Sequence, residues 1–421
     1  MTTNDASRPP RARWPLALGL LCLALTAWLA WRALSLGMAD RHADTEPARA
    51  LAWRSDHPLA LLRQAERLAN DPAQAEAAAD HARRALRANP LDGRPYRVLA
   101  QLAAAAGQQG RAAELFGLAA ARSPRDLASQ AWLLDHHLAA GDPVAAMPHL
   151  DLLLRVQPGL FGRIEPLLLA LAATPQAQDA LADRLATAPP WRASLLVLAS
   201  QKAEDPAAIA PLFERLRKAP GGLAAPELEA WLDRLGRENQ WGQAYLTWVS
   251  QLPPERLQGL GNLYNGGFEW EPGQGGFDWR IGRIPGARVD RLPTDGAGGR
   301  LALRVAFEDR RVPFNHVRQQ LALAPGRYRL MGRAKADNLR SERGLVWTLS
   351  CAGSGKALGE TPPLRGSGPW RGFQAEFDVP ADNCGGQWLM LHLPARIPAE
   401  QRIGGQAWFD DLKITRLQPP P

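Results

Sequence analysis

The chain has little lysine and little cysteine. Its 421 residues include three Cys, and its net charge of +8 is carried by 45 Arg and only five Lys. The arginines are spread through the chain and mixed with 42 acidic residues. A nucleic-acid binder would concentrate its basic residues in a patch or stripe. We therefore expect no nucleic-acid partner.

The chain also lacks the short motifs that mark common enzymes. It has no Gly-x-Ser-x-Gly elbow, no Walker loop, no His-Glu-x-x-His and no Cys-x-x-Cys. A glycosidase needs two carboxylates held about 5 to 9.5 Å apart. No spacing pairs the acidic residues of the C-terminal half, which include Glu269, Glu308, Asp309, Asp410 and Asp411. We expect no catalysis, and a glycan-processing enzyme is the least favoured alternative.

The two halves of the chain differ in composition. Residues 50–250 are rich in Ala, Leu and Arg, which favour helix. Residues 260–417 are rich in Gly, Phe, Trp and β-branched residues, which favour strands and turns. The length alone suggests two or three domains. We therefore expect a multidomain chain in which an α part precedes a β part.

The N-terminal segment is apolar enough to cross a membrane. Residues 14–31 carry no charge, and Trp14, Trp28 and Trp31 lie near the ends, where indoles prefer the headgroup layer. We expect a transmembrane helix over 14–36 after a cytoplasmic tail over 1–13. The alternative is a cleaved signal peptide, but no clean Ala-x-Ala follows the apolar run, because Trp31 and Arg32 interrupt the place where it would lie.

The orientation of this span depends on the cysteines, because basic residues are about equally frequent on both sides of it. Cys22 lies within the span, while Cys351 and Cys384 lie together in the strand-rich half. Two cysteines in one domain of a bacterial envelope protein suggest a disulfide. The alternative is a pair of ordinary buried thiols. We expect a single span of the bacterial inner membrane with most of the chain in the periplasm.

Prolines recur at a fixed interval in the helical half. Pro90, Pro124 and Pro158 lie 34 residues apart. In the repeat that ends at Pro124, small and large residues occur at the spacings of a helical hairpin, namely Tyr96, Leu99, Ala100, Ala103, Gly107, Ala112, Phe116 and Ala119. Small residues let two helices approach closely, Phe116 fills the groove between neighbouring helices, and Gly107 allows the turn between them.

This pattern resembles the tetratricopeptide-repeat (TPR) family over residues 57–160. We expect TPR repeats over 50–160 and degenerate helical repeats over 161–255. The alternative for 161–255 is an unrelated α-helical spacer. Such arrays present a concave surface, so the resemblance implies a protein partner.

Several short runs after residue 256 alternate with a period of two. Leu389, Leu391 and Leu393 alternate with Met390 and His392, and similar runs occur over 301–307 and 373–379. This alternation indicates strands with one face in a core. We expect seven or eight strands over 256–421 in an antiparallel β-sandwich of the jelly-roll type.

The two ends of this region resemble jelly-roll carbohydrate-binding modules. The matching residues are Asn265, Gly266, Phe268, Glu269 and Trp279 at the start, and Phe409, Asp410, Asp411 and Leu412 at the end. The resemblance implies a structural calcium held by Glu269 and Asp411. The alternative is that these carboxylates cap turns or bond to backbone.

The resemblance also implies a sugar platform of exposed aromatic rings. The candidate platform residues are Trp270, Trp347, Trp370 and Trp388. We expect Trp279 and Trp408 to pack in the core instead. Trp388 and Met390 are the most specific indication, since the alternation places them opposite the three leucines.

Together these patterns favour a non-catalytic, membrane-anchored envelope scaffold. Its TPR array would bind a protein, and its jelly roll would contact a glycan. The layout resembles accessory proteins of bacterial exopolysaccharide assembly and export. The alternative is a general envelope scaffold whose sandwich contacts only proteins.

Overall fold

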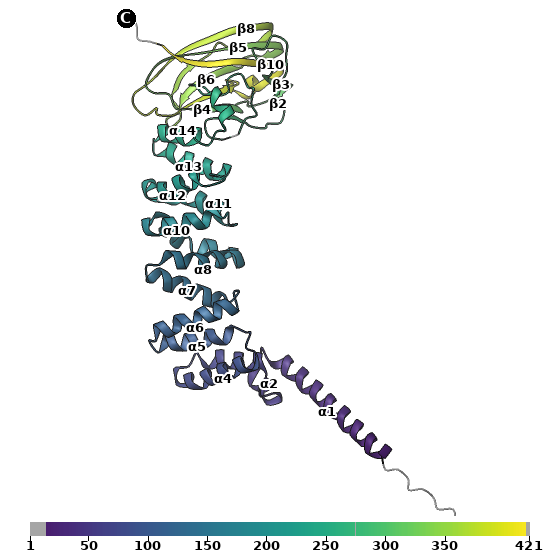
Figure 1. The fold of residues 1–421 in the computed structure, drawn as a ribbon. Coiled ribbons are helices and arrows are strands. Elements are labelled where there is room, and N and C mark those ends of the chain that lie inside the picture. The colour runs from purple at the N-terminus through teal and green to yellow at the C-terminus, as the bar shows by residue number, and fades with distance from the viewer. Residues whose placement is uncertain (1–13, 274, 418–421) are drawn as a thin grey trace, which may run out of the picture. The chain divides into compact units, whose positions relative to one another are not determined.

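The computed structural model describes residues 14–273 and 275–417 (Figure 1). The expected fold class is confirmed, because an apolar N-terminal helix, helical hairpins and an antiparallel β-sandwich follow one another along the chain. The chain divides into two compact units between Arg163 and Ile164. The expected cytoplasmic tail, residues 1–13, lies outside the described residues.

The first unit is helical. Its helices are α1 (Trp14–His42), α2 (Pro47–Trp53), α3 (Pro58–Leu68), α4 (Ala75–Ala88), α5 (Arg94–Ala105), α6 (Gln109–Arg122), α7 (Leu127–Ala139) and α8 (Pro143–Val156), with short 3-10 turns at Pro72–Gln74 and Pro158–Arg163. Helices α3 and α4, α5 and α6, and α7 and α8 pack as hairpins. Pro90, Pro124 and Pro158 each follow the second helix of a hairpin, because proline cannot continue a helix.

The small residues of the repeat bring the helices of a hairpin together. Ala100, Ala112 and Ala119 are fully buried, and Phe116 packs among them. Gly107 has φ +76, in the left-handed region that favours glycine, and it makes the turn between α5 and α6. The packing roles expected from the spacing are therefore confirmed for this repeat.

Arginines connect one hairpin to the next. The Arg97 guanidinium bonds to Glu66 of α3, and its Nε lies 3.1 Å from Asp126. The Gly93 amide donates to the Ser123 hydroxyl at 2.9 Å. Arg97 therefore joins α5 to the preceding hairpin and to the start of the next one, while the bond between Gly93 and Ser123 joins the two ends of the α5–α6 hairpin. The abundance of arginine thus has a structural use as well as an effect on net charge.

The second unit begins with six helices. They are α9 (Glu165–Ala173), α10 (Pro175–Ala186), α11 (Arg192–Lys202), α12 (Pro206–Lys218), α13 (Ala225–Arg237) and α14 (Trp241–Val249). Here too arginines join elements about one repeat apart: Arg192 bonds to Glu227 at 2.8 Å, and Arg234 donates to the Ala203 carbonyl at 2.7 Å. These helices belong to the same compact unit as the sandwich.

The sandwich consists of two five-stranded antiparallel sheets within the described residues. Sheet A has the order β1 (Trp279–Ile281), β4 (Val317–Leu321), β9 (Gln387–His392), β6 (Val346–Cys351), β7 (Ala357–Glu360). Sheet B has the order β2 (Ala287–Leu292), β3 (Ala302–Arg311), β10 (Arg402–Arg416), β5 (Gly326–Ser341), β8 (Gly366–Val379). The described strands thus outnumber the seven or eight expected, because short edge strands such as β1 are hard to recognise in sequence.

The core lies between the two sheets and follows the expected alternation. Leu389 and Leu391 of β9 are fully buried, while Trp388 and Met390, which alternate with them, point outward and are half-buried. A disulfide joins Cys351, at the end of β6, to Cys384, just before β9, with an S–S distance of 2.00 Å. This is the pair that the sequence singles out.

Within the second unit, the last helical hairpin is joined to the outer side of sheet A. Glu229 of α13 forms an ion pair with Arg280 of β1 at 2.6 Å and accepts a hydrogen bond from the Gly276 amide at 2.8 Å. Trp248 of α14 packs against Phe277, with ring centroids 5.8 Å apart. The outer face of sheet A is therefore partly engaged by the helices.

Candidate functional site

The first and last segments of the sandwich meet beside Gly266 and Leu412. The backbone of Leu412 approaches Gly266 so closely that a Cβ at position 266 would lie 1.8 Å from the Leu412 carbonyl oxygen. The Leu412 amide donates to the Gly266 carbonyl at 3.0 Å. Asn265 bonds through its side chain to both the amide and the carbonyl of Trp270. Gly266 is thus required by the close approach of the first segment to β10, and Asn265 holds the turn that follows it.

Three carboxylates gather at this meeting point. Asp410 accepts hydrogen bonds from the amides of Gly298 and Asp411, and Glu269 accepts one from the Leu301 amide at 3.0 Å. Burial raises the pKa of Asp410; those two amides lower it, and the negative charges of Asp411 and Glu269 raise it further. The carboxylates are therefore close enough to repel one another.

This cluster has the hard oxygen atoms that calcium prefers. Among the described residues, however, no three His, Cys, Asp or Glu side chains are grouped so as to hold a metal ion by themselves. Asp411 also lies 3.3 Å from the Arg333 guanidinium. A calcium ion held by Glu269 and Asp411 would thus need backbone oxygens as well, while the observed contacts match the alternative in which the carboxylates bond to the loop.

Trp347 is not an exposed platform. It is 1% exposed and packs in the core against Trp279 and Phe409, with ring centroids 5.6 and 5.5 Å away. The reason is that both Val346 and Trp347 are buried, so the alternation in this apolar strand does not reveal which face is the outer one. The expectation for Trp347 is therefore corrected, while Trp279 does lie in the core.

Trp388 points outward from sheet A, but its ring is already covered. The guanidinium carbons of Arg280 and Arg318 lie 5.2 and 4.9 Å from its ring centroid. Such cation–π contacts stabilise arginine over an indole. Arg280 is also held by Glu229 of the helical hairpin. A sugar would have to displace these groups to reach the ring.

The other two candidates lie in different places. Trp270 stacks on Tyr264, with centroids 6.0 Å apart, in the segment that precedes β1. Trp370 of β8 is half-buried beside Arg333 of β5, whose guanidinium carbon lies 5.4 Å from its ring centroid. The Trp370 indole donates to the Asp295 carbonyl at 2.9 Å. Trp370 therefore lies on the outer face of sheet B.

Trp408 also lies on this outer face, and the expectation that it packs in the core is wrong. Its neighbours Ala407 and Phe409 are buried, whereas Trp408 is half-buried and pairs across strands with Arg304 and Lys335. The Lys335 ammonium lies 5.2 Å from the Trp408 ring centroid. Three successive residues of β10 are apolar, so the sequence pattern does not show which of them face the core.

Polar side chains extend across the sheet from Trp408. The strand register places Asp290, Arg304, Trp408 and Lys335 in one row over β2, β3, β10 and β5. Arg304 donates to Asp290 at 2.7 Å. At about 4.8 Å between strands, this row is roughly 14 Å long. It combines one aromatic ring with hydrogen-bond donors and acceptors on a rigid sheet.

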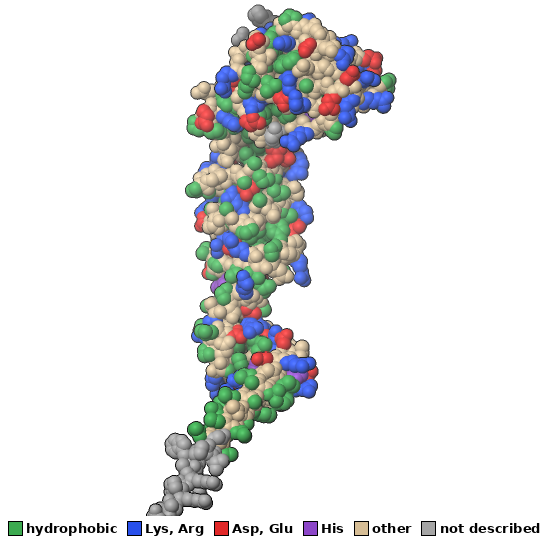
Figure 2. All heavy atoms as spheres, turned by 90° about the vertical axis from the view of Figure 1, so that its right-hand side faces the viewer, with side chains coloured by type: hydrophobic (Ala, Val, Ile, Leu, Met, Phe, Trp, Pro, Cys, Tyr) green, Lys and Arg blue, Asp and Glu red, His purple; other side chains and the backbone are tan. Residues whose placement is uncertain are grey.

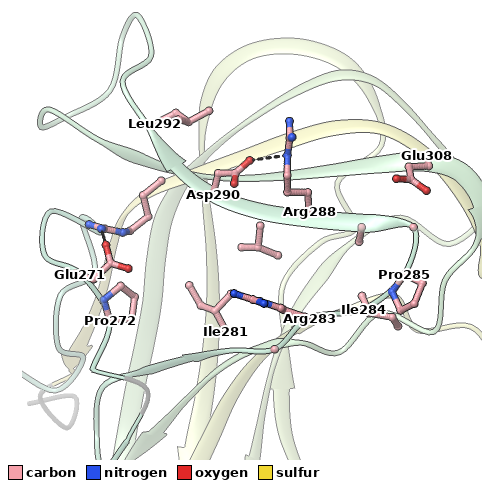
Figure 3. A pocket seen from close by; sticks show the side chains of 15 residues that line it. Glu271, Pro272, Ile281, Arg283, Ile284, Pro285, Arg288, Asp290, Leu292 and Glu308 are labelled. Carbon is pink, nitrogen blue, oxygen red and sulfur yellow. Dashed lines mark hydrogen bonds and ion pairs between the residues drawn. The ribbon is translucent and has the colours of Figure 1, made fainter.

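A hollow adjoins one end of this row (Figure 3). It has a volume of about 870 Å³ and lies at the edge of the sandwich where β1 and β2 face each other. Ile281 and Ile284 line it together with Arg288 and Asp290, which form an ion pair at 3.0 Å. Nothing in the local sequence pattern marked this hollow, because it depends on how two edge strands of different sheets are placed.

Comparison with known proteins gives solved structures that are similar to the sandwich. No protein-family model matches this chain, and no curated protein matches it, so the TPR assignment stays a prediction. A solved structure titled "CBM4 structure and function" shares 20% identity with a TM-score of 0.28, covering 37% of this chain and 99% of that one. The CBM22-1 xylan-binding domain of Xyn10C from Paenibacillus barcinonensis shares 14% identity with a TM-score of 0.26, covering 37% of this chain and 94% of that one. TmCBM61, solved with beta-1,4-galactotriose, shares 18% identity with a TM-score of 0.26, covering 38% and 99%. At these sequence identities and TM-scores, the similarity gives no information about ligands. The assignment of the fold rests on the strand pairing described above.

Proposed function

We propose that this chain is a non-catalytic, membrane-anchored envelope scaffold whose sandwich binds a glycan through the outer face of sheet B. The observation that carries the proposal is the outward position of Trp408 within the row of polar side chains. An indole offers a flat apolar surface with a polar edge. Its neighbours Arg304, Asp290 and Lys335 can donate to or accept from hydroxyl groups.

Sheet B is the more accessible of the two sheets. Within the second unit, α14 lies beside β4 of sheet A, while β5, β8 and β10 are on the opposite side of the sandwich (Figure 1). The side chain of Lys335 covers part of the Trp408 ring, but it is a flexible stem with a mobile ammonium group. It can move aside and remain close enough to bond to a bound ligand.

Charges of both signs are mixed over the sandwich. Figure 2 shows acidic and basic side chains interspersed on its visible face. Asp290 contacts both Arg288 and Arg304, so two cations share one carboxylate. This mixture suits a ligand with many hydroxyl groups better than a polyanion, which would favour a patch of one sign.

Replacing Trp408 with alanine should therefore weaken glycan binding at least about tenfold, or about 1.4 kcal/mol, because a central aromatic contact is lost. Trp370→Ala should weaken it to a smaller degree, since Trp370 lies toward the edge of the same face. The measurement is binding of the purified chain to a polysaccharide array, followed by titration with the glycan that binds best. Trp388→Ala is the matched control on sheet A and should bind as the unaltered chain does.

Three other outcomes would replace this proposal. Loss of binding in Trp388→Ala but not in Trp408→Ala would move the site to sheet A. No binding to any polysaccharide would favour the scaffold that contacts only proteins. Release of sugar products that is lost in Glu269→Gln would indicate a glycan-processing enzyme.

We propose calcium as a structural ligand of the carboxylate cluster, with Glu269 and Asp411 as its side-chain ligands. The ion would offset the burial of Asp410, which is the main cause of its raised pKa, and the smaller contribution from the charges of Asp411 and Glu269. Calcium at one hundred times its Kd should add about 2.7 kcal/mol to the free energy of unfolding. The test is thermal unfolding in calcium and in EGTA, with Glu269→Gln as the variant that loses the effect. Equal melting temperatures in calcium and in EGTA would mean that the carboxylates bond only to the loop.

The remaining parts of the proposal concern the anchor and the partner. The described residues include one N-terminal helix that is long and apolar enough to span a membrane. We propose that it is an inner-membrane anchor, that the rest of the chain is periplasmic, and that the hairpins of the first unit bind a protein of exopolysaccharide assembly or export. Photo-cross-linking in cells from Gln101, an exposed position of α5, tests the partner, and no adduct there would count against it.

A further inference from the structure

Helix α1 has two parts with different surroundings. It runs without a break from Trp14 to His42. From Leu18 to Leu34 its leucines are exposed, with Leu20 at 70% and Leu34 at 53%. From Ser35 onward the helix is packed, with Ser35 at 7% and Ala39 fully buried. The change occurs within a single residue along the helix.

The C-terminal part of α1 belongs to the folded first unit. Asp40 bonds to the buried His57 at 2.7 Å, at the start of α3. Ala43, just after α1, packs with Ala50 of α2 and Ala60 of α3. Removing this part would expose the apolar side of the first hairpin. The same helix therefore serves as an apolar span and as the end cap of the helical array, which argues against its removal as a signal peptide.

The length of the apolar part of α1, from Trp14 to Leu34, locates the membrane surface. The helix rises about 1.5 Å per residue, so the stretch from Trp14 to Leu34 is about 31 Å long. This matches the hydrocarbon thickness of about 30 Å. The hydrocarbon layer must end between Trp31 and Leu34, since Trp31 already contacts Trp53 and from Ser35 onward the helix is packed against its own chain. The first hairpin therefore begins at the membrane surface.

A group of aromatic and charged residues lies at this level. We call it the collar, and it consists of Trp31, Arg32, Trp53, Arg54 and Asp56. The rings of Trp31 and Trp53 are 6.1 Å apart, which joins α1 to the end of α2. Arg54 bonds to Asp56 at 2.9 Å. That guanidinium lowers the pKa of Asp56, and the positive charge of Arg32 adds a smaller effect. Arg32 directly follows Trp31 on α1.

We propose that the collar lies in the headgroup layer of the membrane that α1 crosses, with phospholipid headgroups as its partner. Indoles prefer this layer, and arginine binds phosphate through a planar fork of donors. The collar has two arginines and one aspartate, so its net charge is positive. The solenoid is then held at the bilayer by a continuous helix and a lateral contact, without a flexible linker. This inference rests on the proposed membrane anchor.

The test uses a fluorophore placed in the collar. Trp53→Cys and Asp56→Cys are made in full-length protein with Cys22→Ala, the native disulfide is kept, and the single thiol is labelled with NBD. The protein is reconstituted into phosphatidylglycerol and phosphatidylcholine vesicles that contain a lipid with a nitroxide on its headgroup. The Asp56 side chain is 67% exposed, so Asp56→Cys should keep the fold even if Trp53→Cys disturbs the fold.

The fluorophore should be quenched at positions 53 and 56. A label at Val144→Cys is the control, because Val144 is 71% exposed and lies two hairpins further along the same unit, away from α1 (Figure 1). It should not be quenched. Protein that floats with the vesicles but shows no quenching at 53 and 56 would overturn the collar while leaving the anchor intact. Protein that fails to float, or mature protein from cells that begins after Leu34, would overturn the anchor and the collar together.

Discussion

Replacing Cys351 and Cys384 together with alanine is expected to lower the free energy of unfolding of the sandwich by about 3 to 4 kcal/mol. The disulfide closes a loop with a sequence separation of 33, and its removal gives the unfolded chain more conformations. Both residues are buried, so reductant should act slowly on the folded protein. The measurement is the denaturant midpoint followed by tryptophan fluorescence.

The free thiol is the control for this prediction. Cys22 is exposed and unpaired, so Cys22→Ala should leave the midpoint unchanged. A double variant of Cys351 and Cys384 with the midpoint of the unaltered chain would show that the pair does not stabilise the sandwich. Trapping of thiols in intact cells extends the test, because disulfides persist in oxidising compartments. Free thiols at both positions in cells would place the sandwich in the cytoplasm, against the proposed orientation.

Truncating Trp279 to alanine is expected to cost about 3 to 5 kcal/mol, whereas Trp408→Ala should cost less than about 1 kcal/mol. Trp279 is fully buried between Phe268 and Trp347, and its indole donates to the Asn265 carbonyl at 2.9 Å. Its removal leaves a cavity and an unpaired buried carbonyl. Trp408→Ala leaves no comparable cavity, because the ring that it removes lies on the outer face of sheet B.

The two variants form a matched pair in one domain, compared by equilibrium unfolding in guanidinium chloride. Trp279→Phe adds an intermediate case, since it keeps most of the volume and loses the indole donor. We expect its cost to fall between those of the two alanine variants. Equal destabilisation by Trp279→Ala and Trp408→Ala would mean that Trp408 is a core residue and that the glycan site is elsewhere.

Much of the helical half follows from its sequence because the interactions are local. The spacing of Pro90, Pro124 and Pro158 indicates where the second helix of each hairpin ends, and proline enforces that end directly. Ala100 and Phe116 take the positions that the repeat implies. The continuation of α1 beyond residue 36 was not expected, because its last turns are stabilised by contacts with α2 and α3 and not by their own composition.

The candidate site was harder to predict because several apolar residues are adjacent in its strands. In β10 the run Ala407, Trp408, Phe409 fits either phase of a period of two, and only the packing of Phe409 between the sheets decides it. In β6 both Val346 and Trp347 are buried, so Trp347 could not be told from an exposed ring. Trp388 was placed on the correct outer face, yet only the folded chain brings Arg280 and Arg318 over its ring.

The order of an apolar helix, repeated hairpins and a two-layered β region could be predicted from residue patterns alone, because periodicity and proline placement act over a few residues. The sequence also singled out Cys351 and Cys384 as partners by their shared domain. Only the tertiary structure decided which sheet faces the helices and which stays open, because that choice depends on contacts such as Glu229 with Arg280, far apart in the chain. The same long-range packing turned Trp408 outward and built the end of α1 into the first unit.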